Sequence, residues 1–311
     1  MQSTREWLRG SGLPGGDAGG LPTSTRTFAD GGRFRVEIPS VEGPAVLDAV
    51  LAEADACKVP VHRVSQGSGG LMLSDAELAQ LATVAADRGL EVSLFARPTA
   101  AWDTGALAYL APAAMGGQVR GAEGLVHCLE DIRRVAEAGI RSVLVSDLGV
   151  LRTAARMRAD GALPPDLQFK LSVLAGPANP AAAQLAADLG ADTLNLPTDL
   201  SLAQIAAIRQ AVDIPLDVYV EAPDDLGGFV RHYEIPELVR IAAPIYLKFG
   251  LRNAPSIYPS GSHLEATAVA LARERVRRAR LGLDLLHRYD PTSVTAASSL
   301  PARGLAVPVP A

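Results

Sequence analysis

The feature that most constrains this chain is a regular alternation of short apolar strands and amphipathic helical segments. The strands are rich in β-branched and aromatic residues, and the intervening segments carry apolar residues at helical spacing. We expect strands at 34–38, 59–65, 91–96, 142–147, 169–175, 193–197, 216–221 and 245–250. Eight strands alternating with helices over about 250 residues predict an α/β fold of the (β/α)8 (TIM) barrel type.

An open doubly wound sheet is the alternative architecture. It is disfavoured because no GxGxxG turn follows the first strand and because the strand count ends at eight. We therefore expect a single domain with its barrel at residues 33–289. Residues 1–32 are rich in Gly, Pro, Ser and Thr and predict a flexible N-terminal arm, and the Pro/Ala/Ser-rich residues 290–311 predict a disordered tail.

Composition narrows the class of partner. The chain of 311 residues is 48% hydrophobic with a net charge of −5, and outside the arginines of the last helix, residues 273–280, it has no basic cluster. This balance argues against nucleic acid. The arginine-rich helix face is a solvated or subunit-facing surface, which leaves a homo-oligomer open. No apolar segment is long enough for a membrane span or a signal peptide, so we expect a cytoplasmic protein.

The two cysteines exclude some metal centres. Cys57 and Cys128 are the only cysteines, and neither lies in a CxxC motif. A zinc ribbon or a four-cysteine iron–sulfur cluster is therefore not expected.

Alternating polar residues on the strands predict a polar barrel interior. Helices cover the outer face of each strand, so polar side chains should point inward, and those near a strand's C-terminal end should line the mouth. The inward set on six strands is Arg35, Glu37, Ser93, Arg97, Lys170, Ser172, Thr193, Asn195, Asp217, Tyr219, Glu221, Tyr246 and Lys248. The second and fourth strands are ambiguous, and there we favour Arg63 over His62 and Asp147 over Ser146.

Four inward residues are candidates for catalysis: Glu37, Asn195, Glu221 and Lys248, which lie late on their strands. Lys170 and Asp217 lie earlier and are expected in a structural layer. Because burying an unpaired charge costs several kcal/mol, the lysines and Arg63 must meet carboxylates. The alternative is that all these groups only neutralise one another.

Two mechanisms suit this set, and both stay open. In the first, a divalent ion (magnesium, manganese or zinc) is bound by Glu37, Asp147, Glu221 and His263, and Lys248 positions the substrate. In the second no metal is needed: Lys248 attacks a carbonyl as a Schiff-base lysine, while Glu37, Glu221 or Tyr219 transfers protons.

The loop after the eighth strand predicts an anionic substrate. GLRNAPSIYPSGS, residues 250–262, leads to a helix at Ser262, where the spacing to Glu265 fits a capping box. Barrels often bind phosphate or carboxylate at such a helix N-terminus. Candidate substrate-binding residues in this loop and in the interior are Arg63, Arg97, Tyr219, Tyr246, Arg252, Asn253 and Ser260.

The segment from Asp131 to Glu221 has a strand that ends in Asp147 before Gly-Val-Leu, a loop bearing Asn179, and a helix that ends in Leu-Gly-Ala. With these motifs it resembles the barrel core of peptidase family U32. Family members commonly carry a His-Gly after the seventh strand and cysteines beyond it. This chain differs, because it has Val220-Glu221-Ala222-Pro223 at that position and no cysteine. The iron–sulfur cluster of the family is therefore not carried over to this chain.

Together these features predict a U32 peptidase-like barrel enzyme. It would act at the C-terminal mouth on a small anionic (carboxylate or phosphate) substrate or a short peptide, by metal-assisted hydrolysis or lyase chemistry. A metal-free Schiff-base lyase or aldolase using Lys248, and a non-catalytic binding or scaffold barrel, are the alternatives.

Overall fold

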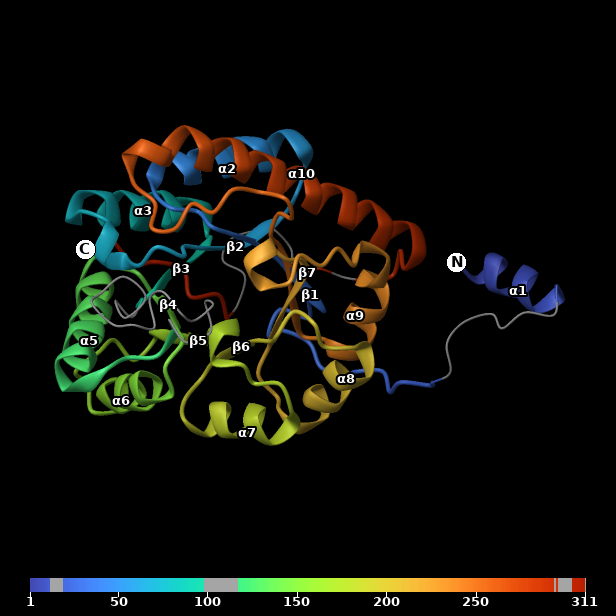
Figure 1. The fold of residues 1–311 in the computed structure, drawn as a ribbon, viewed down its shortest axis with the longest axis horizontal. Coiled ribbons are helices and arrows are strands. Elements are labelled where there is room, and N and C mark those ends of the chain that lie inside the picture. Colours follow the sequence, from blue (N-terminus) through green and yellow to red (C-terminus); the bar gives the residue numbers. More distant parts are fainter. Residues whose placement is uncertain (12–18, 98–116, 294, 296–303, 311) are drawn as a thin grey trace.

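The eight strands of the described residues form one closed parallel barrel (Figure 1). The computed structural model describes residues 1–11, 19–97, 117–293, 295 and 304–310. Each strand pairs with the next in the chain, and β8 pairs with β1 to close the ring. The strands are β1 (Phe34–Pro39), β2 (Val61–Ser65), β3 (Glu91–Phe95), β4 (Ser142–Val145), β5 (Gln168–Leu171), β6 (Thr193–Asn195), β7 (Leu216–Glu221) and β8 (Ile245–Phe249). The predicted (β/α)8 barrel is confirmed.

Helices surround the barrel and follow its strands in turn (Figure 1). They are α2 (Pro44–Cys57), α3 (Asp75–Arg88), α5 (Gly121–Glu137), α6 (Leu148–Ala159), α7 (Pro180–Asp188), α8 (Leu202–Ala211), α9 (Ile235–Ala242) and α10 (Glu265–Tyr289). Single turns of 3-10 helix lie in the loops: η1 (Gly70–Met72), η4 (Val173–Ala175), η5 (Asp224–Leu226), η6 (His232–Glu234) and η7 (Ser262–Leu264). Within the described residues, no helix is both long and apolar enough to cross a membrane.

A capping box forms at the start of α3 but not at the start of α10. Ser74 caps α3, and the side chain of Glu77 reaches back to its backbone N–H. The predicted box at Ser262 and Glu265 is wrong. Residues 262–264 form a 3-10 turn, so α10 begins after Leu264, which has no side chain able to cap it.

The hydrophobic core lies between the strands and their helices. Phe34, Val36 and Ile38 of β1 point outward and are fully buried, as are Leu247 and Phe249 of β8. These apolar faces alternate with the polar residues that point to the barrel axis. The core is therefore a ring, and the barrel interior is a separate polar layer.

Parts of both terminal segments pack on the barrel, where the sequence predicts a flexible arm and a disordered tail. Phe28 is buried at the N-terminal end of the barrel, with its ring centroid 5.3 Å from that of Tyr246. In the tail, Val309 donates a backbone hydrogen bond to Gly139 (2.8 Å), and Ala306 is buried. Helix α1 (Gln2–Gly10) buries none of its residues and stands apart from the barrel (Figure 1).

Candidate functional site

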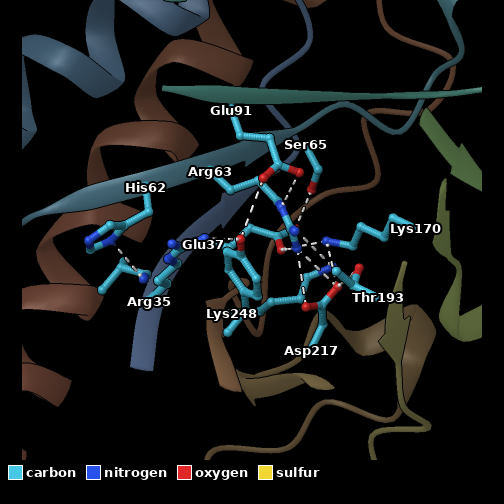
Figure 2. A network of polar contacts seen from close by, with 12 residues as sticks. Arg35, Glu37, His62, Arg63, Ser65, Glu91, Lys170, Thr193, Asp217 and Lys248 are labelled. Carbon is cyan, nitrogen blue, oxygen red and sulfur yellow. Dashed lines mark hydrogen bonds and ion pairs between the residues drawn. The ribbon is translucent and has the colours of Figure 1, made fainter. Parts of the chain in front are cut away.

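Six charged side chains form an ion network inside the barrel (Figure 2). Each is at most 1% exposed, and they come from six neighbouring or facing strands. Three are cations and three are anions: Arg63, Lys170 and Lys248 with Glu37, Glu91 and Asp217. The interior is thus charge-balanced, which is the condition for burying so many ions.

Glu37 is the centre of this network. Its Oε2 atom accepts a hydrogen bond from Lys170 Nζ and lies 3.3 Å from Arg63 Nη1. Its Oε1 atom accepts from Ser65 Oγ at 2.7 Å and lies 3.2 Å from Lys248 Nζ. Burial raises the pKa of Glu37, but the charges of Lys170, Lys248 and Arg63 outweigh burial and hold the pKa well below its usual range. Glu37 is therefore a permanent anion.

Asp217 and Glu91 complete the network. Asp217 lies 3.1 Å from Arg63 Nη1 and 3.2 Å from Lys170 Nζ, and it accepts a hydrogen bond from Thr193 Oγ1 at 3.2 Å. Arg63 Nε donates to Glu91 at 2.7 Å. Arg63 therefore lies inward, as predicted. Its guanidinium is paired with three carboxylates, so it is not placed to bind a substrate.

Tyr246 lies at the N-terminal end of the barrel. Its hydroxyl accepts a hydrogen bond from Arg35 Nη1 at 3.1 Å and donates to Glu91 at 3.4 Å. Arg35 in turn pairs with Asp30 at 2.9 Å. Tyr246 precedes Lys248 by two residues, so it belongs one layer below the mouth. The prediction that it binds substrate is not supported by this position.

A cavity of about 210 Å³ opens at the C-terminal mouth. Its walls come from the ends of all eight strands and from the loops that follow them. The residues with polar side chains among its lining are Ser40, Ser65, Gln66, Arg97, Ser172, Asn195, Tyr219, Asp225, Lys248, Ser256 and Tyr258. Four predicted site residues are therefore brought together here: Arg97, Asn195, Tyr219 and Lys248.

Lys248 joins the ion network to the cavity. Its Nζ atom lies 4.3 Å from the ring centroid of Tyr219, a cation–π contact, and 3.2 Å from Glu37. Lys170, by contrast, lies against both Glu37 and Asp217 and is absent from the cavity wall. Of these two buried lysines, Lys248 is the one that belongs to the cavity wall.

Arg97 and Asn195 line the same cavity. Arg97 Nη1 donates to the carbonyl of Gly67 at 3.0 Å, and its guanidinium lies 5.3 Å from the ring centroid of Phe95. Burial lowers the pKa of Arg97 from its ordinary value, although an arginine remains charged at neutral pH. Asn195 is 1% exposed, and among the described residues its Oδ1 atom has no hydrogen-bond partner.

Tyr258 is a cavity residue that the sequence reasoning missed. Its hydroxyl shares a hydrogen bond with Ser40 Oγ, and Ser40 has a left-handed backbone with φ of 63°. Its ring lies against Gly67, where a Cβ atom would approach Cε1 of Tyr258 to 2.5 Å. The sequence signals were the QGSGG run after β2 and the tyrosine of the β8 loop, but neither shows that the two loops meet.

The prediction that Glu221 points to the barrel axis is wrong. The register between β7 and β8 shifts between Tyr219 and Glu221, so the two side chains no longer share a face. Glu221 contacts Arg278 of α10 at 3.4 Å and His232 at 3.4 Å, and it accepts from the backbone N–H of Arg252 at 3.0 Å. Burial raises its pKa, but these donors and charges lower it overall. Glu221 is a link between β7 and α10.

The four predicted metal ligands are not assembled. Asp147 lies beyond the end of β4 and caps α6, accepting from Gly149 N at 2.7 Å. Within β4, Ser142 pairs with Ser93 and Leu144 lines the cavity. His263 is exposed in η7, while Glu37 and Glu221 have the separate partners described above. Across the described ranges, no group of three or more His, Cys, Asp or Glu side chains is arranged to hold a metal ion.

The loop after β8, which was predicted to bind an anion, is also arranged differently from the prediction. Arg252 is exposed and lies 3.7 Å from Asp224, whose carboxylate also accepts from the backbone N–H of Asn253 at 2.5 Å. Ser260 is buried, and its backbone N–H donates to Ser68 Oγ at 2.7 Å. None of these three predicted residues lines the mouth cavity.

Comparison with known proteins supports the family resemblance. Peptidase family U32 matches residues 119–222. No curated protein matches the chain.

Several solved structures are similar to this one. A putative lyase/mutase from Burkholderia cenocepacia J2315 is 20% identical, with 86% of each chain covered and a TM-score of 0.46. The U32 peptidase Mk0906 is 17% identical over 79% of this chain and 98% of its own, with a TM-score of 0.41. The family match confirms the resemblance inferred from the sequence: residues 119–222 of this (β/α)8 barrel are similar to peptidase family U32.

Proposed function

We propose that this chain is an enzyme that acts in the mouth cavity on a small carbonyl compound bearing a carboxylate. In this proposal Lys248 forms a Schiff base with the carbonyl carbon, and Arg97 binds the carboxylate. The observation that carries the proposal is the position of Lys248. Lys248 is 1% exposed as a residue and belongs to the wall of the cavity, and its amine lies 3.2 Å from Glu37.

The electrostatics of the cavity favour an anion. Among the lining residues that the structure describes, Lys248 and Arg97 contribute two positive charges to the wall, and the carboxylate is that of Asp225, an exposed residue. The other polar groups are hydroxyls and amides. A carboxylate between the two cations would make charge-assisted hydrogen bonds, which are stronger than neutral ones.

The size of the cavity favours a small substrate. An apolar cavity of about 150 Å³ holds one benzene molecule. At about 210 Å³, the mouth cavity suits a ligand of roughly eight to ten non-hydrogen atoms. A short oxo acid fits this size, whereas most of a peptide would lie outside the cavity.

The ion network keeps Glu37 paired while Lys248 reacts. An amine attacks a carbonyl only after losing its proton. When Lys248 gives its proton to solvent in the open mouth, Glu37 keeps two cations, Lys170 and Arg63, so the carboxylate is not left unpaired. The amine then adds to the carbonyl carbon, and loss of one water molecule gives the Schiff base.

Reductive trapping tests this function. The wild-type protein would be incubated with sodium cyanoborohydride and each of pyruvate, 2-oxobutanoate, oxaloacetate and 2-oxoglutarate, and the adduct located by peptide mass spectrometry. We expect one adduct per chain, on Lys248. The chain has only three lysines, so exposed Lys58 serves as the internal reference for non-specific modification.

Two variants make the test decisive. Lys248→Arg keeps the interior charge but removes the reactive amine, so the adduct should disappear. Lys58→Arg should leave trapping on Lys248 unchanged. Equal labelling of Lys58 and Lys248, or binding of an oxo acid by wild-type protein without any adduct, would overturn the Schiff-base assignment and favour a non-catalytic binding barrel.

A further inference from the structure

Tyr258 is held at the mouth by more contacts than packing alone requires. Tyr258 lies in the loop after β8. Its ring packs against Gly67 in the loop after β2, and its hydroxyl hydrogen-bonds to Ser40 in the loop after β1. Tyr258 belongs to the wall of the cavity that is also lined by Lys248. Three loops therefore fix one phenol in the cavity of the proposed reactive amine.

The contact with Gly67 fixes the ring. A Cβ atom at Gly67 would lie 2.5 Å from Cε1 and 2.8 Å from Cζ of Tyr258, closer than carbon atoms approach one another. Only glycine leaves room for the ring in this place. The carboxylate of Glu42 holds the same loop by accepting from the backbone N–H groups of Gly67 (2.8 Å) and Ser68 (3.0 Å).

The contact with Ser40 fixes the hydroxyl. A left-handed backbone is uncommon for a serine and is often retained at functional sites, where surrounding structure enforces it. Here the conformation, with φ of 63°, accompanies the hydrogen bond between Ser40 Oγ and the Tyr258 hydroxyl. When Ser40 donates this hydrogen bond, the proton of Tyr258 is free to point into the cavity.

The protonation state suits a proton donor. Burial is the largest influence on the phenol and raises the pKa of Tyr258 above its ordinary value; the charge of Glu42 acts in the same direction. Arg275 and the Ser40 hydrogen bond lower it but do not reverse the shift. Tyr258 therefore carries its proton at neutral pH.

We infer that Tyr258 is the catalytic acid of the proposed reaction and that Ser40 and Gly67 are its positioning residues. The inference rests on the proposed function of Lys248. After Lys248 adds to the substrate carbonyl, the carbon bears one nitrogen and one hydroxyl group. Tyr258 donates its proton to that hydroxyl, the carbon–oxygen bond breaks and water departs, and the nitrogen lone pair forms the carbon–nitrogen double bond. Ser40 stabilises the phenolate until solvent returns a proton.

The rate of trapping separates this role from that of Lys248. The initial rate of adduct formation on Lys248 would be measured at reductant concentrations high enough that the rate no longer depends on the reductant. General acid catalysis typically contributes about 10²- to 10⁴-fold. Tyr258→Phe keeps the ring on Gly67 and should slow adduct formation by at least tenfold, while the adduct still forms on Lys248. Tyr233→Phe, at an exposed tyrosine away from the cavity, should not change the rate.

The positioning residues supply a second test. Ser40→Ala and Gly67→Ala should each slow adduct formation in the wild-type background. Neither should slow it further when combined with Tyr258→Phe, because both act through the hydroxyl that this variant lacks. Additive losses in the double variants would mean that Ser40 and Gly67 matter only for folding or access.

The two proposals fail in different ways. If no oxo acid gives an adduct on wild-type Lys248, both are overturned. If Lys248 is trapped and Tyr258→Phe forms the adduct at the wild-type rate, the function of Lys248 stands and the role of Tyr258 is overturned. Circular dichroism of each variant would show whether a slow rate reflects lost structure, and a folded Ser40→Ala variant keeps the test valid if Tyr258→Phe unfolds.

Discussion

Lys248 Nζ lies 3.2 Å from Glu37 Oε1, and this ion pair is where the structural interior meets the mouth cavity. Glu37 faces three cations and is fully buried, whereas Lys248 faces a cavity on its other side. We therefore expect Glu37 to matter for folding and Lys248 for chemistry. Substitutions should separate these two roles.

Glu37→Gln should destabilise the fold strongly. The variant leaves Lys170, Arg63 and Lys248 with too few carboxylates inside the barrel, and breaking a buried ion pair in this way costs about 3–5 kcal/mol. The free energy of unfolding from urea denaturation measures the loss. Asp55→Asn breaks an exposed pair with Arg88, in which the side chains are 43% and 65% exposed, and should cost less than about 1 kcal/mol. Equal effects of the two substitutions would contradict the structural role of Glu37.

The two buried lysines should differ in the same assay. Lys170→Met removes the partner of both Glu37 and Asp217 and should cost about 3–5 kcal/mol in the free energy of unfolding. Lys248→Met leaves Glu37 paired with Lys170 and Arg63, so its cost should be clearly smaller. If Lys248→Met is the more damaging of the two, Lys248 is mainly a structural cation.

The alternation of residues on the strands was enough to predict the fold and much of the interior. A period of two places Glu37, Lys170, Asp217 and Lys248 on one face of their strands, and the closed barrel then brings them together. Because the outer face of each strand must be apolar, the polar side chains of that strand have to point toward the barrel axis. The position of Lys248 at the mouth follows from its place late on β8.

The errors arose where regular alternation ends. The register shift before Glu221 turns its side chain toward α10, and a sequence pattern of period two does not show a bulge. Asp147 lies one residue beyond Ser146, and its carboxylate satisfies the N-terminus of α6. Tyr258 was missed because its partners, Ser40 and Gly67, lie about 200 residues away in the chain, and no local pattern predicts which loops of a barrel touch.

Glu221→Gln should therefore affect stability and not chemistry. The substitution removes the charge that faces Arg278 and His232 but keeps a side chain able to accept from Arg252 N, so we expect a loss of about 1–3 kcal/mol. The rate of reductive trapping on Lys248 should equal that of wild type. A loss of trapping in a folded Glu221→Gln variant would restore Glu221 to the catalytic group.

Asp131 should make stability depend on pH near neutrality. This residue of α5 is enclosed beside Gly70, where a Cβ atom would lie 3.2 Å from its carboxylate. Burial is the main cause that raises its pKa to about 6, and Arg134 and the backbone N–H of Leu71 only partly oppose it. In the unfolded chain an aspartate titrates near its ordinary value of 3.8. The folded state therefore binds the proton more tightly than the unfolded state.

The sign of this effect follows from linkage. A group whose pKa is raised on folding contributes stability that is fully present below the unfolded pKa and is lost as pH rises through the folded pKa. For Asp131 the loss should run from about pH 4 to pH 6 and reach at most about 3 kcal/mol. Asp131→Asn keeps the shape of the side chain and cannot ionise, so its free energy of unfolding should fall less over this interval than that of wild type. Parallel pH profiles for the two proteins would show that Asp131 ionises normally in the folded state.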